Sequence, residues 1–273
     1  MPRPHTLEAV LGTPGTRLYH YTTRGAALEH ILNAGSLRVS SFSGMNDPRE
    51  AMDWRINPVG APGRSPDDVR RLKADFNAAV KRRSKVVCFT KDVEGGADPI
   101  LDRGWAHPRM WAQYAENHAG VCLFFDRTAV SARIASALEP HGEIFSGDVV
   151  YANDPPELVP GVGLPFDVDI GAIETLSLDV AVSQHLQHHS QALFRTKLSD
   201  WQDEHEFRFI VFTQDEEPIY VPIAGTLVAV AMGWQFHEVY EPSLTTLCGR
   251  SQVPVLRCSW DNGSPMIDLS QPT

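Results

Sequence analysis

The sequence lacks the short signatures of several large enzyme classes. It contains no GxxxxGK(S/T) pattern, no GxGxxG after a strand, no GxSxG and no HExxH. These patterns mark phosphate-binding loops, dinucleotide-binding Rossmann units, hydrolases with a serine elbow and zinc metalloproteases. We therefore expect none of these four kinds of site.

Cysteine and long apolar runs are also scarce. The four cysteines are scattered without a CxxC pair, and Cys88 and Cys122 lie in apolar runs, which indicates reduced, buried thiols. No apolar run approaches the roughly 18 residues needed to span a bilayer. The first residues, Met-Pro-Arg-Pro-His, lack the apolar core of a signal peptide. We expect a cytoplasmic protein with no membrane partner.

Positive charge is in the minority. The chain has 24 Lys and Arg against 34 Asp and Glu, a formal net charge of −10, which argues against a general electrostatic grip on nucleic acid. A helix predicted from Pro66 gathers most of the clustered positive charge on its outer face. Its members are Arg70, Arg71, Lys73, Lys81, Arg82 and Arg83. We interpret this face as solvated, although a nucleic-acid contact would be sought there first.

Short strands and helices alternate without the regular spacing of βαβ units, which favours a mixed α+β sheet in a single domain over residues 1–273. Residues 152–168 are proline-rich and are expected to be irregular. Strands are expected at 17–22, 37–39, 86–90, 121–125, 149–151, 219–221, 227–232 and 255–259. Helices are expected at 25–34, from Pro48, from Pro66, and at 108–117, 129–138, 169–197 and 243–250.

The predicted helix 169–197 holds His185, His188 and His189 at spacings of three and four. Such spacing can place ring nitrogens on one face, but a zinc site needs three or four converging ligands. Because the neighbouring residues include several glutamines, we interpret the three histidines as part of a solvated polar face. No metal is expected.

The most unusual stretch runs from Trp201 to Phe212, where a cluster of charge leads directly into an apolar run. In a strand, alternate side chains point to opposite faces. Glu204, Glu206 and Arg208 would then share one side, and the opposite, packed side would hold Phe207, Phe209 and Val211. The charged side is either a solvated ladder or the floor of a polar cleft.

Other polar groups suited to such a cleft are spread along the chain: His20 on the first strand, Asn46 in a loop and Thr90 at a strand end. Each segment also has a local explanation. His20 suits a hydrogen-bonded strand histidine, and Asp47-Pro48 suits the start of a helix. Whether these groups converge is left open by the sequence alone.

Seven of these segments together resemble a widespread bacterial family, the domain of unknown function 2971. In order, they are LYHYT (18–22), MNDPRE (45–50), CFT (88–90), MWAQYA (110–115), HAGV (118–121), Lys197 and WQDEHEFR (201–208). The resemblance covers about residues 17–235 and leaves 236–273 as a C-terminal extension. It implies no activity.

A more distant resemblance is to ADP-ribosyltransferase-like proteins. LYHYT with the following helix is similar to their first motif, VCFT (87–90) to their second, and Glu206, or Glu204, to their third-motif glutamate. The resemblance implies a mostly antiparallel split β-sheet with flanking helices, and NAD as the substrate. It further implies Glu206 and Glu204 as catalytic carboxylates. The residues expected to contact NAD are His20, Tyr21, Thr22, Asn46, Thr90 and Tyr114, with Tyr21 and Tyr114 both candidates for stacking on nicotinamide.

The resulting expectation is an NAD-binding, ADP-ribosyltransferase-like protein that transfers ADP-ribose to an acceptor or cleaves NAD. The acceptor is left open between protein, nucleic acid and a small molecule. A second interpretation is a non-catalytic nucleotide-sensing or interaction module, in stress or phage defence. A third, a metal-dependent phosphodiester enzyme built on Glu204, Glu206 and His20, ranks last because the spacing shows no metal-ligand signature.

Overall fold

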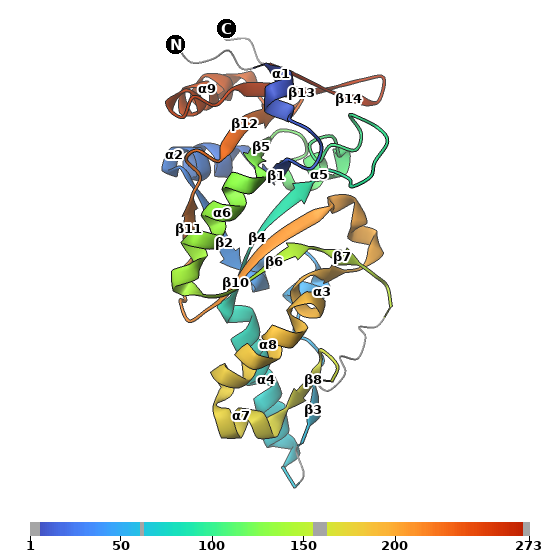
Figure 1. Cartoon of the computed structure of the whole chain (residues 1–273), viewed down its shortest axis with the longest axis vertical. Helices are drawn as coiled ribbons and strands as arrows, with labels where there is room; N and C mark the ends of the chain where they lie inside the picture. Colours follow the sequence, from blue (N-terminus) through green and yellow to red (C-terminus); the bar gives the residue numbers. More distant parts are fainter. Residues whose placement is uncertain (1–5, 61–62, 155–162, 270–273) are drawn as a thin grey trace.

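The computed structural model describes residues 6–60, 63–154 and 163–269 (Figure 1). Within them, ten strands form one open sheet in the order β11-β2-β4-β1-β5-β12-β13-β14, and β10 lies between β4 and β6. Only the β12–β13 pair of this sheet is parallel. The strands are β1 (Arg17–Thr22), β2 (Ser36–Ser41), β4 (Ser84–Lys91), β5 (Val121–Asp126), β6 (Gly142–Asp148), β10 (Glu206–Thr213), β11 (Ile219–Pro222), β12 (Leu227–Met232), β13 (Val255–Asp261) and β14 (Ser264–Leu269).

Helices flank this sheet, so the expected mixed α+β architecture with a mostly antiparallel sheet is confirmed. They are α1 (Leu7–Leu11), a π-helix (Ala26–Ile31) that continues into α2 (Leu32–Ala34), α3 (Pro48–Ala51), α4 (Pro66–Arg83), α5 (Pro108–Tyr114), α6 (Arg127–Leu138), α7 (Ile170–Leu176), α8 (Leu178–Phe194) and α9 (Glu241–Arg250). Two small sheets pair β3 (Asn57–Val59) with β8 (Asp167–Asp169) and β7 (Val150–Tyr151) with β9 (Thr196–Lys197). Among the described residues, no helix is long and apolar enough to cross a membrane.

The sheet divides the core in two. On one face, alternate residues such as Leu18, Phe89 and Phe209 pack against α6 and the π-helix. The other face carries two separate clusters. One joins Tyr19 and Tyr21 to α5, and the second joins the β10 side chains Ile210 and Phe212 to α4 and α8. In Figure 1, α4, α7 and α8 extend from one end of the sheet, and α9 lies at the opposite end.

Local sequence signals explain most helix boundaries. The side chain of Ser65 accepts a hydrogen bond from the Asp68 amide at the start of α4, and Asp47 caps α3 in the same way. Gly35 ends α2 with a left-handed φ of 64°, as a residue without Cβ readily does. These boundaries lie close to the predicted ones.

Three expectations about elements were wrong. The helix expected at 169–197 is broken at Ser177, whose φ is 83°, and it ends at Phe194, after which Thr196 and Lys197 form β9. Strands β6 and β14 were missed because their sequences, GEIFSGD and SPMIDL, do not alternate clearly between apolar and polar residues. The expected irregular stretch 152–168 ends in β8, and its residues 155–162 lie outside the described part of the chain.

Two of the three histidines of α8 do not belong to a solvated face, whereas His188 is exposed as expected. His189 is buried, its ring centroid lies 4.6 Å from that of His185, and His185 Nε2 lies 2.9 Å from the carbonyl oxygen of Pro165. Burial lowers the pKa of His185 to about 4. The reason for the error is that α8 packs against α4 along this side, where Phe76 contacts the His185 ring.

The cations of α4 are less exposed than expected. Lys81 is buried, with its ammonium 5.2 Å from the centroid of the Trp54 ring, and Arg83 pairs with Asp179 of α8. Arg70 and Arg71 each form an ion pair with an aspartate three residues earlier. Much of the expected basic face is therefore neutralised or covered.

Ile210 provides a test of this packing, because it is fully buried on the β10 face that meets α4 and α8. We expect Ile210→Ala to lower the free energy of unfolding by about 2–5 kcal/mol, measured by urea denaturation. Tyr220→Ala is the control, since this side chain on β11 is 58% exposed and its loss should change stability by about 0.5 kcal/mol or less. Equal effects of the two substitutions would contradict the packing described.

Candidate active site

The site lies where the sheet splits along one edge of β4. Strand β10 pairs with β4 from Glu206↔Thr90 to Phe212↔Ser84 and so occupies one edge. On the other edge, β4 pairs first with β2, at residues 85 and 86, and then with β1, at residues 90 and 91. Between these two pairings the neighbouring strands separate from β4, and no strand of the described residues pairs with its backbone on that side.

His20 of β1 bridges this gap. Its Nδ1 lies 2.9 Å from the carbonyl oxygen of Cys88, which can only accept a hydrogen bond, so Nδ1 carries the proton and donates it. Burial lowers the pKa of His20, and the Cys88 bond offsets this only in part, so the ring is neutral at pH 7. Its Nε2 is therefore a hydrogen-bond acceptor, and the ring lines the pocket described next.

A partly open cavity of about 100 Å³ lies beside this split. Thr90 lines it between two other lining residues, since it pairs with Tyr19 of β1 on one side and with Glu206 of β10 on the other. Six of the eight residues expected at the site line the cavity. They are His20, Tyr21, Thr90, Tyr114, Glu204 and Glu206.

Thr22 and Asn46 do not line the cavity. Thr22 is buried beyond the split, where β1 pairs with β5 at Val121. Asn46 is exposed, and its neighbour Met45 lines the cavity instead. The structure thus brings six of the expected residues together and leaves these two outside.

Glu204 and Glu206 do not lie on one strand, as the alternating pattern suggested. Residues Ser199–Glu204 form a 3₁₀-helix, and His205 follows with a left-handed φ of 43° before β10 begins at Glu206. This turn nevertheless directs both carboxylates to the same partner. Lys197 Nζ lies 2.7 Å from Glu204 Oε2 and 2.9 Å from Glu206 Oε2.

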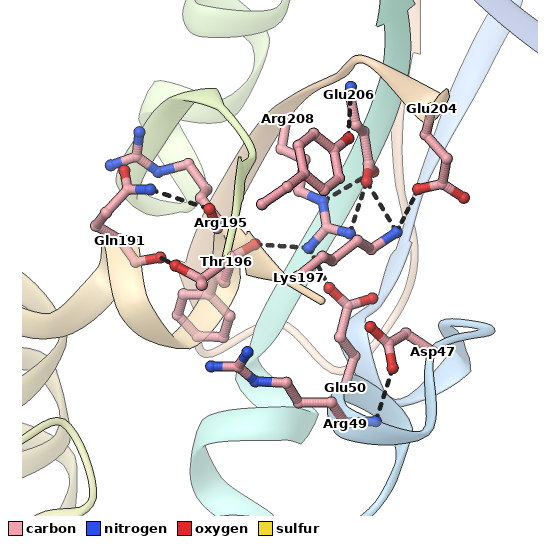
Figure 2. Close-up of polar contacts among 12 residues, drawn as sticks. Asp47, Arg49, Glu50, Gln191, Arg195, Thr196, Lys197, Glu204, Glu206 and Arg208 are labelled. Atoms are coloured by element: carbon pink, nitrogen blue, oxygen red, sulfur yellow. Dashed lines mark hydrogen bonds and ion pairs between the residues drawn. The ribbon is translucent and has the colours of Figure 1, made fainter. Parts of the chain in front are cut away.

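Arg208 holds Glu206 from the other side (Figure 2). Its guanidinium donates to both carboxylate oxygens of Glu206, from Nε to Oε1 at 2.8 Å and from Nη2 to Oε2 at 2.9 Å. Its Nη1 donates to Glu50 Oε1 at 2.5 Å and to the carbonyl oxygen of Phe194 at 2.6 Å. Because Arg208 is fully buried, the charged side of β10 is an internal ion-pair cluster and not a solvated ladder.

The two carboxylates of the cavity have opposite pKa shifts. Burial alone would raise the pKa of Glu206, but the positive charges of Arg208 and Lys197 outweigh it and lower this pKa to about 2. Burial raises the pKa of Glu204, the charge of Lys197 opposes this, and repulsion from Glu206 adds to it. Glu206 is thus a fixed anion, and Glu204 is the carboxylate more ready to take up a proton.

Tyr114 completes this arrangement. Its hydroxyl donates to Glu204 Oε1 at 2.5 Å, and burial, with the nearby Glu204 charge, raises the pKa of the phenol. Lys197 remains a cation because the charges of Glu206, Glu50 and Glu204 outweigh the effect of its burial and raise its pKa. Counted as ionised, the cluster of three glutamates and two cations has a formal charge of −1.

Tyr21 and Tyr114 differ in how accessible their rings are to a ligand. Tyr21 is buried, its hydroxyl donates to the carbonyl oxygen of Gly104 at 2.7 Å, and its ring packs edge-on against Trp111. Tyr114, at the end of α5, is half-buried and lines the cavity. Tyr114 is therefore the better placed of the two to meet a ligand ring.

Part of the chain is similar to a known protein family. Residues 110–209 match the model of a family described as a protein of unknown function, DUF2971. The expected resemblance to this family is confirmed over those residues. They include Tyr114, Lys197 and the two cavity glutamates, whereas His20 and Thr90 precede them. Neither the curated proteins nor the solved structures provide a match.

Glu50 and Lys197 are the site residues that sequence reasoning missed. Lys197 lies within the matched residues 110–209 and Glu50 precedes them, and no role at the site was predicted for either. The signal was the excess of buried-strand charge at 204–208, since two glutamates beside one arginine require another cation. In the described part of the chain, no three His, Cys, Asp or Glu side chains are grouped so as to hold a metal ion.

Removal of Arg208 tests the ion-pair cluster. Arg208→Leu would leave Glu50, Glu204 and Glu206 facing Lys197 alone, and we expect it to lower the free energy of unfolding by about 3–5 kcal/mol. The matched control is Arg70→Leu, because the Arg70–Asp67 pair is solvent-exposed and should be worth less than about 1 kcal/mol. A parent-like stability of Arg208→Leu in urea denaturation would refute the assignment.

The lowered pKa of Glu206 predicts a specific pH dependence. A carboxyl whose folded pKa lies below its unfolded value stabilises the protein above the unfolded value and loses this contribution as pH falls. We therefore expect the parent to lose stability steeply between about pH 4.5 and pH 2, the ordinary and the lowered pKa values. Glu206→Gln should be less stable at pH 7 and show a shallower decline over that range. Parallel curves in chemical denaturation would count against the ionised Glu206.

Proposed function

We propose that the protein binds NAD in the cavity at the split of the sheet and cleaves the bond between ribose and nicotinamide, with transfer of ADP-ribose to an acceptor or to water. The proposal includes an ADP-ribosyltransferase-like character for the split sheet. The observation that carries it is the convergence of His20, Thr90 and Glu206, from three neighbouring strands, on one cavity.

The charge of the cavity suits this chemistry. The nicotinamide ring of NAD is a cation, and the ribose acquires positive, oxocarbenium-like charge as the bond breaks. Glu206 stays ionised because its pKa is lowered to about 2, and the whole cluster has one more carboxylate than it has cations. A fixed anion in a buried site stabilises developing positive charge without reorganisation.

The remaining cavity groups take complementary roles. The Nε2 of His20 accepts a hydrogen bond from a ribose hydroxyl, and the half-buried ring of Tyr114 packs against nicotinamide. In the reaction, the bond from ribose C1′ to the pyridinium nitrogen breaks and its electron pair leaves with nicotinamide. The acceptor oxygen or nitrogen forms a new bond to C1′, and its proton passes to Glu204, whose raised pKa suits a base.

The size of the cavity limits what it encloses. At about 100 Å³ it is smaller than the roughly 300–1,000 Å³ of pockets that enclose whole ligands of drug size. A cavity of roughly 150 Å³ holds a single benzene ring, so this one takes up only part of the nicotinamide ring. The ribose and the rest of the dinucleotide lie along its open side.

One observation favours a second function, binding of a nucleotide without turnover. Both oxygens of Glu206 already accept hydrogen bonds from Arg208, and both oxygens of Glu204 have partners in Tyr114 and Lys197. If these contacts persist when a ligand is bound, neither carboxylate is free to react. The protein would then act as a nucleotide sensor that uses the same cavity.

Nicotinamide release from NAD separates the two functions. We expect the parent protein to release nicotinamide, and Glu204→Gln to slow this by about 100-fold or more, because a positioned base contributes 10²–10⁴ in rate. His20→Ala should weaken NAD binding measured by calorimetry. Glu94→Gln is the control, since this exposed side chain pairs with Lys91 outside the cavity.

The outcomes are distinct. NAD binding that is lost in His20→Ala, with no nicotinamide released with or without cell lysate, would establish the sensor function. No binding and no release by a folded parent protein would refute both. Release that a chelator abolishes would contradict the proposed reaction, in which no step uses a metal.

A further inference from the structure

A second cleft lies on the other side of α5 from the proposed NAD cavity. Met110 and Tyr114 of α5 line the first cavity, whereas Pro108, at the start of this helix, and His118, just beyond it, line the second. The second cleft has a volume of about 620 Å³ and is completed by Trp234, Ser259 and Trp260. Its walls therefore come from α5, the segment after β12 and the end of β13.

Aromatic rings dominate this cleft. The centroid of the His118 ring lies 6.0 Å from that of Trp234 and 6.2 Å from that of Trp260. Trp111 stacks on His118 at 6.5 Å with an interplanar angle of 8°. Trp234 is 51% exposed, although a tryptophan ring on a protein surface usually gains from burial. About half of the surface of Trp234 thus remains open to a ligand.

The backbone that presents His118 is held in an unusual conformation. Three successive residues other than glycine, Glu116, Asn117 and His118, have φ values of 51°, 50° and 69°. Such residues each cost of the order of 1 kcal/mol or more and persist where the surroundings impose them. Here the carbonyl oxygen of His118 accepts from the Gln235 amide at 3.1 Å, and a Cβ on Gly233 would come within 2.1 Å of it. The left-handed turn thereby fixes His118 against Trp234.

Two polar atoms of the cleft have no partner among the residues that the structure describes. They are the indole Nε1–H of Trp260 and Nδ1 of His118, both shielded from solvent. A buried N–H without an acceptor costs about 1–3 kcal/mol, so such groups call for an explanation. Both belong to rings that line the cleft, so each nitrogen reaches a ligand only after a rotation of its ring. A ligand with hydrogen-bonding atoms on the edge of its ring would then supply partners, and a hydrocarbon ring would not.

Charge narrows the ligand further. The described side chains that line the cleft have no formal charge at pH 7, because burial lowers the pKa of His118. A phosphate would find no Lys or Arg among these side chains. A cation could be held by the ring faces alone, but an ammonium has no acceptor for the N–H of Trp260. We propose that this cleft binds a nucleobase, stacked on Trp234 and held at its edge by Trp260, His118 and Ser259. This proposal does not depend on NAD cleavage in the first cavity.

Quenching of tryptophan fluorescence by adenosine and by uridine tests the proposal. We expect saturable binding of at least one nucleoside to the parent protein. Trp234→Ala should weaken it by about 5- to 150-fold, because stacking of one base is worth about 1–3 kcal/mol. The affinity of Trp234→Phe should stay within a few-fold of that of the parent. Trp260→Phe keeps an aromatic ring but loses the N–H donor, and it should weaken binding by about 2- to 10-fold.

Tyr220→Ala is the control, since it removes an exposed ring on β11 away from the cleft. Thermal unfolding of each variant shows that it is folded, and Trp234, being half exposed, tolerates replacement. Failure of both nucleosides to bind the parent at millimolar concentration would overturn the proposal, as would unchanged affinity in a folded Trp234→Ala.

The source of the base is resolved by a single-stranded octanucleotide. Tighter binding than that of the nucleoside, weakening as salt rises, would identify nucleic acid as the source. Equal affinity that is independent of salt would identify a free nucleoside or nucleotide, which the uncharged walls favour. Both results support a nucleobase site, provided that Trp234→Ala weakens the binding that is measured.

Discussion

The guanidinium of Arg208 lies without solvent exposure between Glu206 and Glu50, with the carbonyl oxygen of Phe194 as a further acceptor. A buried cation is tolerated only when each of its donors is paired, because desolvation of an ion costs several kcal/mol. Arg208 therefore ties together three parts of the chain: β10, the short helix α3 and the end of α8. Loss of Arg208 would leave Glu206 and Glu50 in the core with Lys197 as the remaining cation of the cluster.

The same interaction sets the properties of the cavity. Since Arg208 and Lys197 keep Glu206 ionised, the repulsion that results helps to raise the pKa of Glu204, and two neighbouring carboxylates acquire different protonation behaviour. The split of the sheet supplies the space beside them. His20 closes the backbone gap with its Nδ1–H and leaves an acceptor nitrogen on the cavity side. The two carboxylates and the open edge of β4 thus meet at one cavity, although Lys197 and Glu204 lie outside β1, β4 and β10.

Sequence reasoning was most successful where a periodic pattern or a cap signal acts locally, as in α4, α5 and the strands β4 and β5. It failed where packing overrides such signals. Ser177 breaks a stretch that reads as one helix, Lys81 lies over Trp54 although it stands in a run of charges, and His189 is buried beside His185. Glu204 and Glu206 were expected on one strand face. They do converge, but through the left-handed His205, a conformation that the sequence does not predict for a histidine.

The sequence by itself determined that this is an α+β chain of net negative charge, with a glutamate-rich segment entering a buried strand, because composition and periodicity are local properties. It also marked six of the groups that line the cavity, through the types of residue and their order. Only the tertiary structure decided which carboxylate is held as an anion and which is ready to take up a proton. The physical reason is that a pKa in the interior depends on the charges within a few ångströms, and those of Glu50, Lys197 and Arg208 come from segments far apart in the chain.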